Sequence, residues 1–183
     1  MKTKFSSFFG LLLVLAMLVS ACAQAPAAPT TAPAPTTAPA AAPTTTAGAS
    51  GPPLDVNIVV HTAFLDTGNS GSFEASGPAV KAGLICPKGI ATDIINTQES
   101  GDTTAANFLV HKQFVCDDNS GTFTLKIEAR VVFFTEDNGP WNVFSGTGAY
   151  EKLHGEGMDH GDFVFDNSGN VTGVTDNISG KMQ

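Results

Sequence analysis

The stretch Val143-Phe-Ser-Gly-Thr-Gly-Ala-Tyr-Glu-Lys-Leu-His-Gly-Glu-Gly157 contains four glycines at spacings that suit neither a regular helix nor a regular strand. These are Gly146, Gly148, Gly155 and Gly157. Glycine at this density supplies positive φ or lets another backbone approach closely. Between the two pairs, Tyr150 and Leu153 are three residues apart and share one face of a single helical turn. The stretch predicts a corner of a β structure, in which one strand ends near Phe144 and another leaves from Gly155. We interpret it as a folding element.

Upstream of this corner, residues 122–134 show the clearest alternation of apolar and polar side chains in the chain. One face of the predicted strand carries Phe123, Leu125, Ile127, Ala129, Val131 and Phe133. The other face is polar and includes Lys126, Glu128 and Arg130. A slip of one residue would expose the whole apolar row, so the register of this strand is strongly specified.

The same alternation predicts further strands at 54–64, 72–76, 79–86, 90–97, 106–116, 141–144, 155–165 and 171–182. Turns are predicted at 66–71, 117–121, 137–140 and 167–170, with a polar loop over 96–104. An all-β domain of about 130 residues, with turns every ~8–12 residues, is typical of a barrel or a sandwich. We therefore place the folded domain at residues 54–183.

The first 21 residues have the layout of a signal peptide, with two lysines followed by an apolar run too short to span a bilayer comfortably. The sequence Val19-Ser-Ala-Cys22 resembles a bacterial lipobox, which implies that Cys22 carries a lipid and holds the protein on a membrane. An ordinary secretory signal cleaved near Ala21 is the alternative.

Residues 22–53 are predicted to be a disordered linker, since they are mostly Ala, Pro and Thr and offer no large apolar side chains to bury. Loss of residues 1–21, which hold Lys2, Lys4 and no acidic residue, changes the net charge from −8 to −10. This acidic balance argues against nucleic acid as a partner, because binding to a phosphate backbone requires a basic surface.

If Cys22 is the lipidation site, Cys86 and Cys116 remain as a pair. In an exported domain such a pair predicts a disulfide. A reactive or metal-binding pair is the alternative, although the chain has no Cys-x-x-Cys motif.

Three motifs resemble the allene oxide cyclase/dirigent barrel superfamily, especially its small secreted bacterial members. They are Cys86-Pro-Lys-Gly89, Cys116-Asp-Asp-Asn-Ser-Gly-Thr-Phe-Thr124, and the corner with Gly146, Gly148, Tyr150, Leu153, Gly155 and Gly157. The resemblance covers about residues 56–181 and implies an antiparallel eight-stranded β-barrel. It also implies that a homotrimer is possible, as in the plant relatives. It carries over no catalytic residue.

Candidate polar sites each have a simpler explanation. His154 and Glu156 could share a metal ion with a third ligand, or belong to a solvated face with Met158, His160 and Asp162. The oxygen-rich segments 117–121 and 166–170 could attract calcium, or serve as hairpin turns. Glu128 and Arg130 could form an ion pair, and Ser145 lacks the Gly-x-Ser-x-Gly context of a nucleophile. We predict no catalytic residue, no metal and no cofactor.

The inward rows could enclose a ligand cavity lined by Phe123, Leu125, Ile127, Phe163 and Phe165, or pack solid. Our leading hypothesis is a lipid-anchored extracytoplasmic barrel that binds a hydrophobic small molecule or a surface partner without catalysis. The alternatives are an isomerase or cyclase resembling allene oxide cyclase, and a purely structural envelope protein. Charged groups inside the lumen would favour the enzyme, and a packed lumen would favour the structural protein.

Overall fold

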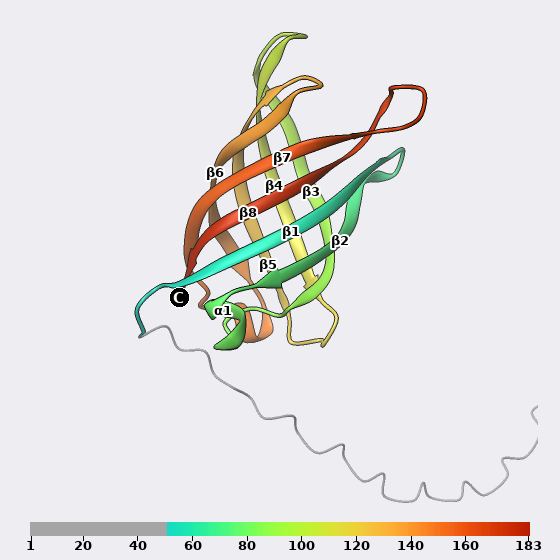
Figure 1. The fold of residues 1–183 in the computed structure, drawn as a ribbon. Coiled ribbons are helices and arrows are strands. Elements are labelled where there is room, and N and C mark those ends of the chain that lie inside the picture. Colours follow the sequence, from blue (N-terminus) through green and yellow to red (C-terminus); the bar gives the residue numbers. More distant parts are fainter. Residues whose placement is uncertain (1–50) are drawn as a thin grey trace, which may run out of the picture. The chain divides into compact units, whose positions relative to one another are not determined.

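The computed structural model describes residues 51–183, which form a closed antiparallel barrel with strand order β1 to β8 (Figure 1). The final strand returns to pair with the first, so that Leu54 lies opposite Met182. The eight-stranded barrel is therefore confirmed. The signal peptide, Cys22 and the linker up to residue 50 lie outside the described residues.

The strands run along most of the domain and are joined mainly by short hairpins. Their bounds are β1 Leu54–Leu65, β2 Gly68–Ser76, β3 Lys88–Gly101, β4 Ala105–Cys116, β5 Thr122–Val132, β6 Glu136–Gly146, β7 Gly155–Phe165 and β8 Val171–Met182. Two short helices, α1 Pro78–Lys81 and the 3-10 turn η1 Gly148–Tyr150, complete the fold. Among residues 51–183, no helix has the length and apolar character needed to cross a membrane.

Alternation along β5 places its apolar row inside the barrel, as the sequence predicts. Phe123, Leu125 and Ile127 are almost completely buried, whereas Glu128 and Arg130 are exposed. Successive side chains of a strand point to opposite faces, so each strand contributes one such row to the lumen.

One end of the barrel is closed by packed aromatic rings and by the connections beside them. Phe114 stacks on Phe123 with ring centroids 4.7 Å apart, and Phe73 meets Phe114 edge-on at 5.1 Å. The Cys86–Cys116 disulfide joins the segment after α1 to the end of β4, with the two Cα atoms 5.9 Å apart. This confirms the predicted bond. In Figure 1, α1 and the C-terminus lie at this same end.

The predicted corner also lies at the closed end and contains the expected turn. Tyr150 is buried, its ring centroid is 5.6 Å from that of Phe123, and its hydroxyl hydrogen-bonds the Ser120 hydroxyl. Leu153 is buried beside it. Gly148 adopts φ +60°, where a β-branched residue would be strained. Gly157 has a different role: it lets Trp141 pack closely against the backbone, because a Cβ there would lie 2.8 Å from Trp141 Nε1.

Four predicted elements are wrong in whole or in part. Of the turn predicted at residues 66–71, only residues 66 and 67 form a turn, because β2 begins at Gly68 and pairs with β1 from there. Residues 79–86 are not a strand, since Pro78 starts α1 and a loop follows it to the disulfide. Residues 96–101 continue β3 and are not part of a loop, because they pair with β4 although nearly every side chain there is exposed. Residues 137–140 lie within β6 and are not a turn. The chain reverses instead around Phe134, which has φ +65°.

Candidate functional site

The other end of the barrel holds a cavity of about 310 Å³ with mostly apolar walls. Its wall residues include Phe108, Val110, Ala129, Val131, Phe163 and Val174. Phe64 and Phe134 stand at its entrance, on the tips of two hairpins, and Phe134 is 68% exposed. Ligand pockets in proteins start at about 300 Å³, so this cavity suits a small molecule.

Two of the five residues predicted to line a cavity do so, and three do not. Ile127 and Phe163 line the cavity. Phe123 and Leu125 are fully buried nearer the closed end, among the packed aromatic rings. Phe165 is 46% exposed because it follows an irregularity in the pairing of β7 with β8, at the open rim. The prediction is therefore wrong for Phe123, Leu125 and Phe165.

At the inner end of the cavity, six polar side chains form a ring across the lumen, which we call the polar layer. It consists of Thr62, Asp93, Lys112, Asp137, Asp159 and Asp176, from β1, β3, β4, β6, β7 and β8 respectively. Five of them line the cavity, and Thr62 hydrogen-bonds two of the others. The layer separates the apolar cavity from the packed aromatic core.

Lys112 is the cation of the polar layer and is only 4% exposed. Its Nζ lies 2.9 Å from Asp93 Oδ1 and 3.0 Å from Asp176 Oδ2, and it donates to Thr62 Oγ1 at 3.1 Å. Burial alone would lower the pKa of Lys112, but the charges of Asp176 and Asp93 outweigh it and raise that pKa above its ordinary value. The lysine is thus held charged, with two carboxylates as its counterions.

Asp137 and Asp159 have no comparable partner. One carboxylate oxygen of each, Oδ1, is buried without a hydrogen bond, and Asp159 is 3% exposed. Burial, followed by the charge of Asp176, raises the pKa of Asp137 to about 7. Burial and the charges of Asp176 and Asp137 raise the pKa of Asp159 to about 8. Near neutral pH this pair therefore holds at least one proton.

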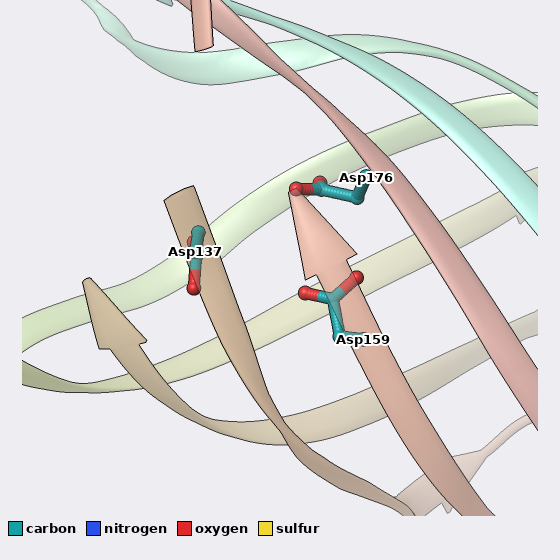
Figure 2. A group of neighbouring side chains, drawn as sticks. All are labelled: Asp137, Asp159 and Asp176. Carbon is teal, nitrogen blue, oxygen red and sulfur yellow. The ribbon is translucent and has the colours of Figure 1, made fainter. Parts of the chain in front are cut away.

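Figure 2 shows Asp137, Asp159 and Asp176 gathered within the barrel, each on its own strand. One ligand atom from each lies within 4.8 Å of the others. A search of residues 51–183 for three or more His, Cys, Asp or Glu side chains close enough to share a metal ion finds these three aspartates. Our sequence prediction did not include it.

The metal ligands considered from the sequence lie elsewhere. His154 and Glu156 are exposed at the closed end, on the outer face of the barrel. His160 and Asp162 are also exposed, and His160 Nδ1 is 2.6 Å from Asn138 Oδ1. These side chains form the solvated face that the sequence offered as the alternative.

The remaining polar candidates are parts of turns or of the surface. Asp118 Oδ1 accepts the Ser120 N–H at 2.9 Å, and Asp166 Oδ1 accepts that of Ser168 at 2.8 Å, which is typical of Asx turns. The pKa of Asp118 is lowered mainly by hydrogen bonds from the Ser120 side chain and backbone, and that of Asp166 by hydrogen bonds from the Asn170 side chain and backbone. Glu128 pairs with Lys126 at 2.6 Å on the exterior, and not with Arg130.

The polar layer left a signal in the sequence that our prediction did not use. Lys112, Asp159 and Asp176 each occupy an inward position in an alternating strand, between smaller or apolar inward neighbours. Asp137 was assigned to a turn. A β-bulge between Asp93 and Ile95 ends the regular inward row of β3 beside the layer.

Comparison of the chain with models of protein families, with curated proteins and with solved structures found no match.

Proposed function

We propose that this protein is a lipid-anchored, extracytoplasmic barrel that binds a small, largely apolar molecule in its lumen. The observation that carries the proposal is the cavity of about 310 Å³ at the open end. A barrel that needed only to be stable would gain by filling this space, because empty apolar volume lowers stability. The exposed aromatic side chains of Phe64 and Phe134 at the entrance give an apolar ligand its first contacts.

The first experiment is native mass spectrometry of the full protein purified from its own host. We expect a bound small molecule that is lost in Ala129→Phe, since Ala129 is buried in the cavity wall and a phenyl ring there fills the space. Val115→Phe is the matched control, because Val115 is exposed on the outer face of β4. If Ala129→Phe folds normally and retains the molecule, the ligand binds elsewhere and the proposal fails.

The lipid anchor is tested separately. Metabolic labelling with a fatty acid should label the protein, and Cys22→Ser should abolish the label. Incorporation into the Cys22→Ser variant would place the modification at another residue and contradict the lipobox assignment.

An isomerase or cyclase is the second candidate, and the polar layer is the observation that favours it. Asp137 and Asp159 have a raised pKa and border the cavity, which are properties of a general acid or base. The two functions differ in outcome: a binding protein releases its ligand unchanged, whereas an enzyme releases a rearranged isomer of the same mass. The open cavity leaves less support for a purely structural role.

A further inference from the structure

We propose that the polar layer receives the ammonium group of an organic amine whose apolar body fills the cavity. The inference rests on the proposed function and specifies the chemical class of the ligand. Its basis is the arrangement of Asp137 and Asp159 at the inner end of an apolar cavity.

The first argument is hydrogen bonding. Asp159 is almost fully buried, and its Oδ1 has no hydrogen-bond partner; Asp137 Oδ1 is buried and also lacks one. A third buried oxygen without a hydrogen bond, Asp93 Oδ1, lies 2.9 Å from Lys112 Nζ and is paired with its charge. Buried polar atoms nearly always have a partner, so the other two acceptors, which lie beside one cavity, require an explanation. A primary ammonium group has three N–H donors and can satisfy both.

The second argument is charge. Four aspartates, one each from β3, β6, β7 and β8, surround Lys112 of β4. The other residues in this region are uncharged: Ile127 and Ala129 from β5, and Thr62 from β1. Lys112 lies within 3.0 Å of Asp93 and Asp176 and balances those two. Burial and mutual repulsion disfavour the ionised forms of the other two carboxyl groups, and a further cation would favour them. Lys112 and, more weakly, the outward-facing His160 lower the pKa of Asp137, whereas Asp176 and Asp93 raise it.

The third argument distinguishes an amine from a metal ion. A divalent ion held by all three aspartates would have to share Asp176 with Lys112, whose Nζ lies 3.0 Å from Asp176 Oδ2. Mg²⁺ also retains several waters, which apolar walls such as those of Val131 and Phe163 do not solvate. An amine needs only Asp137 and Asp159, and its carbon skeleton matches the walls.

The affinity for the amine should depend on pH, because its binding requires ionised carboxylates. Protons leave Asp137 and Asp159 as pH rises through the pKa values of about 7 and about 8. An alkylamine keeps its charge over this range, since its pKa is near that of lysine, about 10.4. Binding therefore strengthens between about pH 6 and about pH 8.5 and releases protons.

The experiment compares 4-phenylbutylamine with 4-phenylbutan-1-ol, which differ in the head group alone, using the full chain and calorimetry. We expect the amine to bind about 10-fold or more tightly than the alcohol, about 1.4 kcal/mol, since hydrogen bonds to charged groups contribute this much or more. Asp159→Asn should remove this preference and leave the affinity for the alcohol within about 3-fold. Asp162→Asn is the matched control, because Asp162 is exposed on the same strand.

The results of this experiment distinguish failure of the amine inference from failure of the proposed function. Equal affinities for the two compounds, or an amine preference that survives Asp159→Asn, would overturn the inference while the proposed function stands. Failure of both compounds to bind protein freed of its native ligand would count against the proposed function itself. A third result would be that calcium binds the wild type but not Asp159→Asn, while neither protein prefers the amine to the alcohol. The ligand of the polar layer would then be a metal ion and not an amine.

Discussion

The two halves of the barrel lumen are built by the same strands and yet differ in what they hold. Along β4, Phe114 is packed among aromatic rings, Lys112 lies in the polar layer, and Val110 faces the cavity. The closed half also carries the disulfide and the corner, whereas the open half carries neither. The aromatic packing, the disulfide and the corner thus lie in one half, and the cavity lies in the other.

The largest effect is expected at the boundary between the halves, in Lys112→Met. Removing the lysine leaves Asp93 and Asp176 buried without a counterion, which typically costs ~3–5 kcal/mol. Urea denaturation measures the change. Lys126→Met is the control, because it removes only an exposed pair with Glu128, worth ~0–1 kcal/mol. Equal losses in both variants would mean that the polar layer does not stabilise the barrel.

Removal of the disulfide should destabilise the closed half next most strongly. The bond closes a loop with a sequence separation of 30, so Cys86→Ala with Cys116→Ala should lower the free energy of unfolding by ~3–4 kcal/mol. Ligand affinity at a temperature where the variant is folded should be unchanged, because the bond lies away from the cavity. A large loss of affinity would show that the two halves are coupled.

Gly148→Val tests the corner. The native φ of +60° strains a β-branched residue, and a Cβ at this position would lie 2.5 Å from the Ser120 carbonyl oxygen. We expect a loss of about 2–3 kcal/mol, measured by thermal unfolding. Gly169→Val separates the two causes, since Gly169 has φ +83° but no neighbouring atom within 4 Å of the place that a Cβ would occupy, and should cost less. Equal costs would assign the whole effect to φ.

The open half should make stability depend on pH. Asp137 and Asp159 have native pKa values of about 7 and about 8, above the unfolded value of about 3.9. Between these limits the native state binds more protons than the unfolded state, so stability falls as pH rises. We expect a loss of roughly 2 kcal/mol from pH 6 to pH 7. Asp159→Asn should flatten this slope, and an unchanged slope would contradict the assignment.

The smallest effect is expected for His154→Ala, which changes an exposed side chain at the closed end. Its free energy of unfolding should stay within about 0.5 kcal/mol of the wild type. Its ligand affinity should also be unchanged, because His154 does not line the cavity. If binding were lost while the fold melted normally, the corner would be part of the site.

The sequence predicted those strands in which inward-facing and outward-facing side chains alternate regularly and which end at turn residues. The bounds of β7 and β8 agree with the prediction, and those of β5 differ by two residues at one end. Alternation does not predict a strand where the strand extends beyond the core. In the second half of β3 the side chains are exposed on both faces, so that apolar and polar residues do not alternate there. Alternation also fails at Asp137–Pro140, where the turn preference of Asn-Gly-Pro is overridden by pairing with β7.

The site was harder to predict because its members are far apart in the chain. Each strand contributes at most one charged residue to the polar layer, and a single inward aspartate has no recognisable spacing to the next. Only the closure of the barrel brings Asp93 near Asp176. The aromatic residues at the two ends were equally hard to tell apart, since Phe123 and Phe163 both occupy inward positions and only one faces the cavity.

The pairing of Leu54 with Met182 places both ends of the domain beside the packed half, and Gln183 is fixed there by reciprocal backbone hydrogen bonds with His154. A fluorophore, affinity tag or sensor surface attached at Gln183 would therefore leave the entrance at the far end unobstructed. The same geometry suits immobilised protein, with every entrance turned toward the sample.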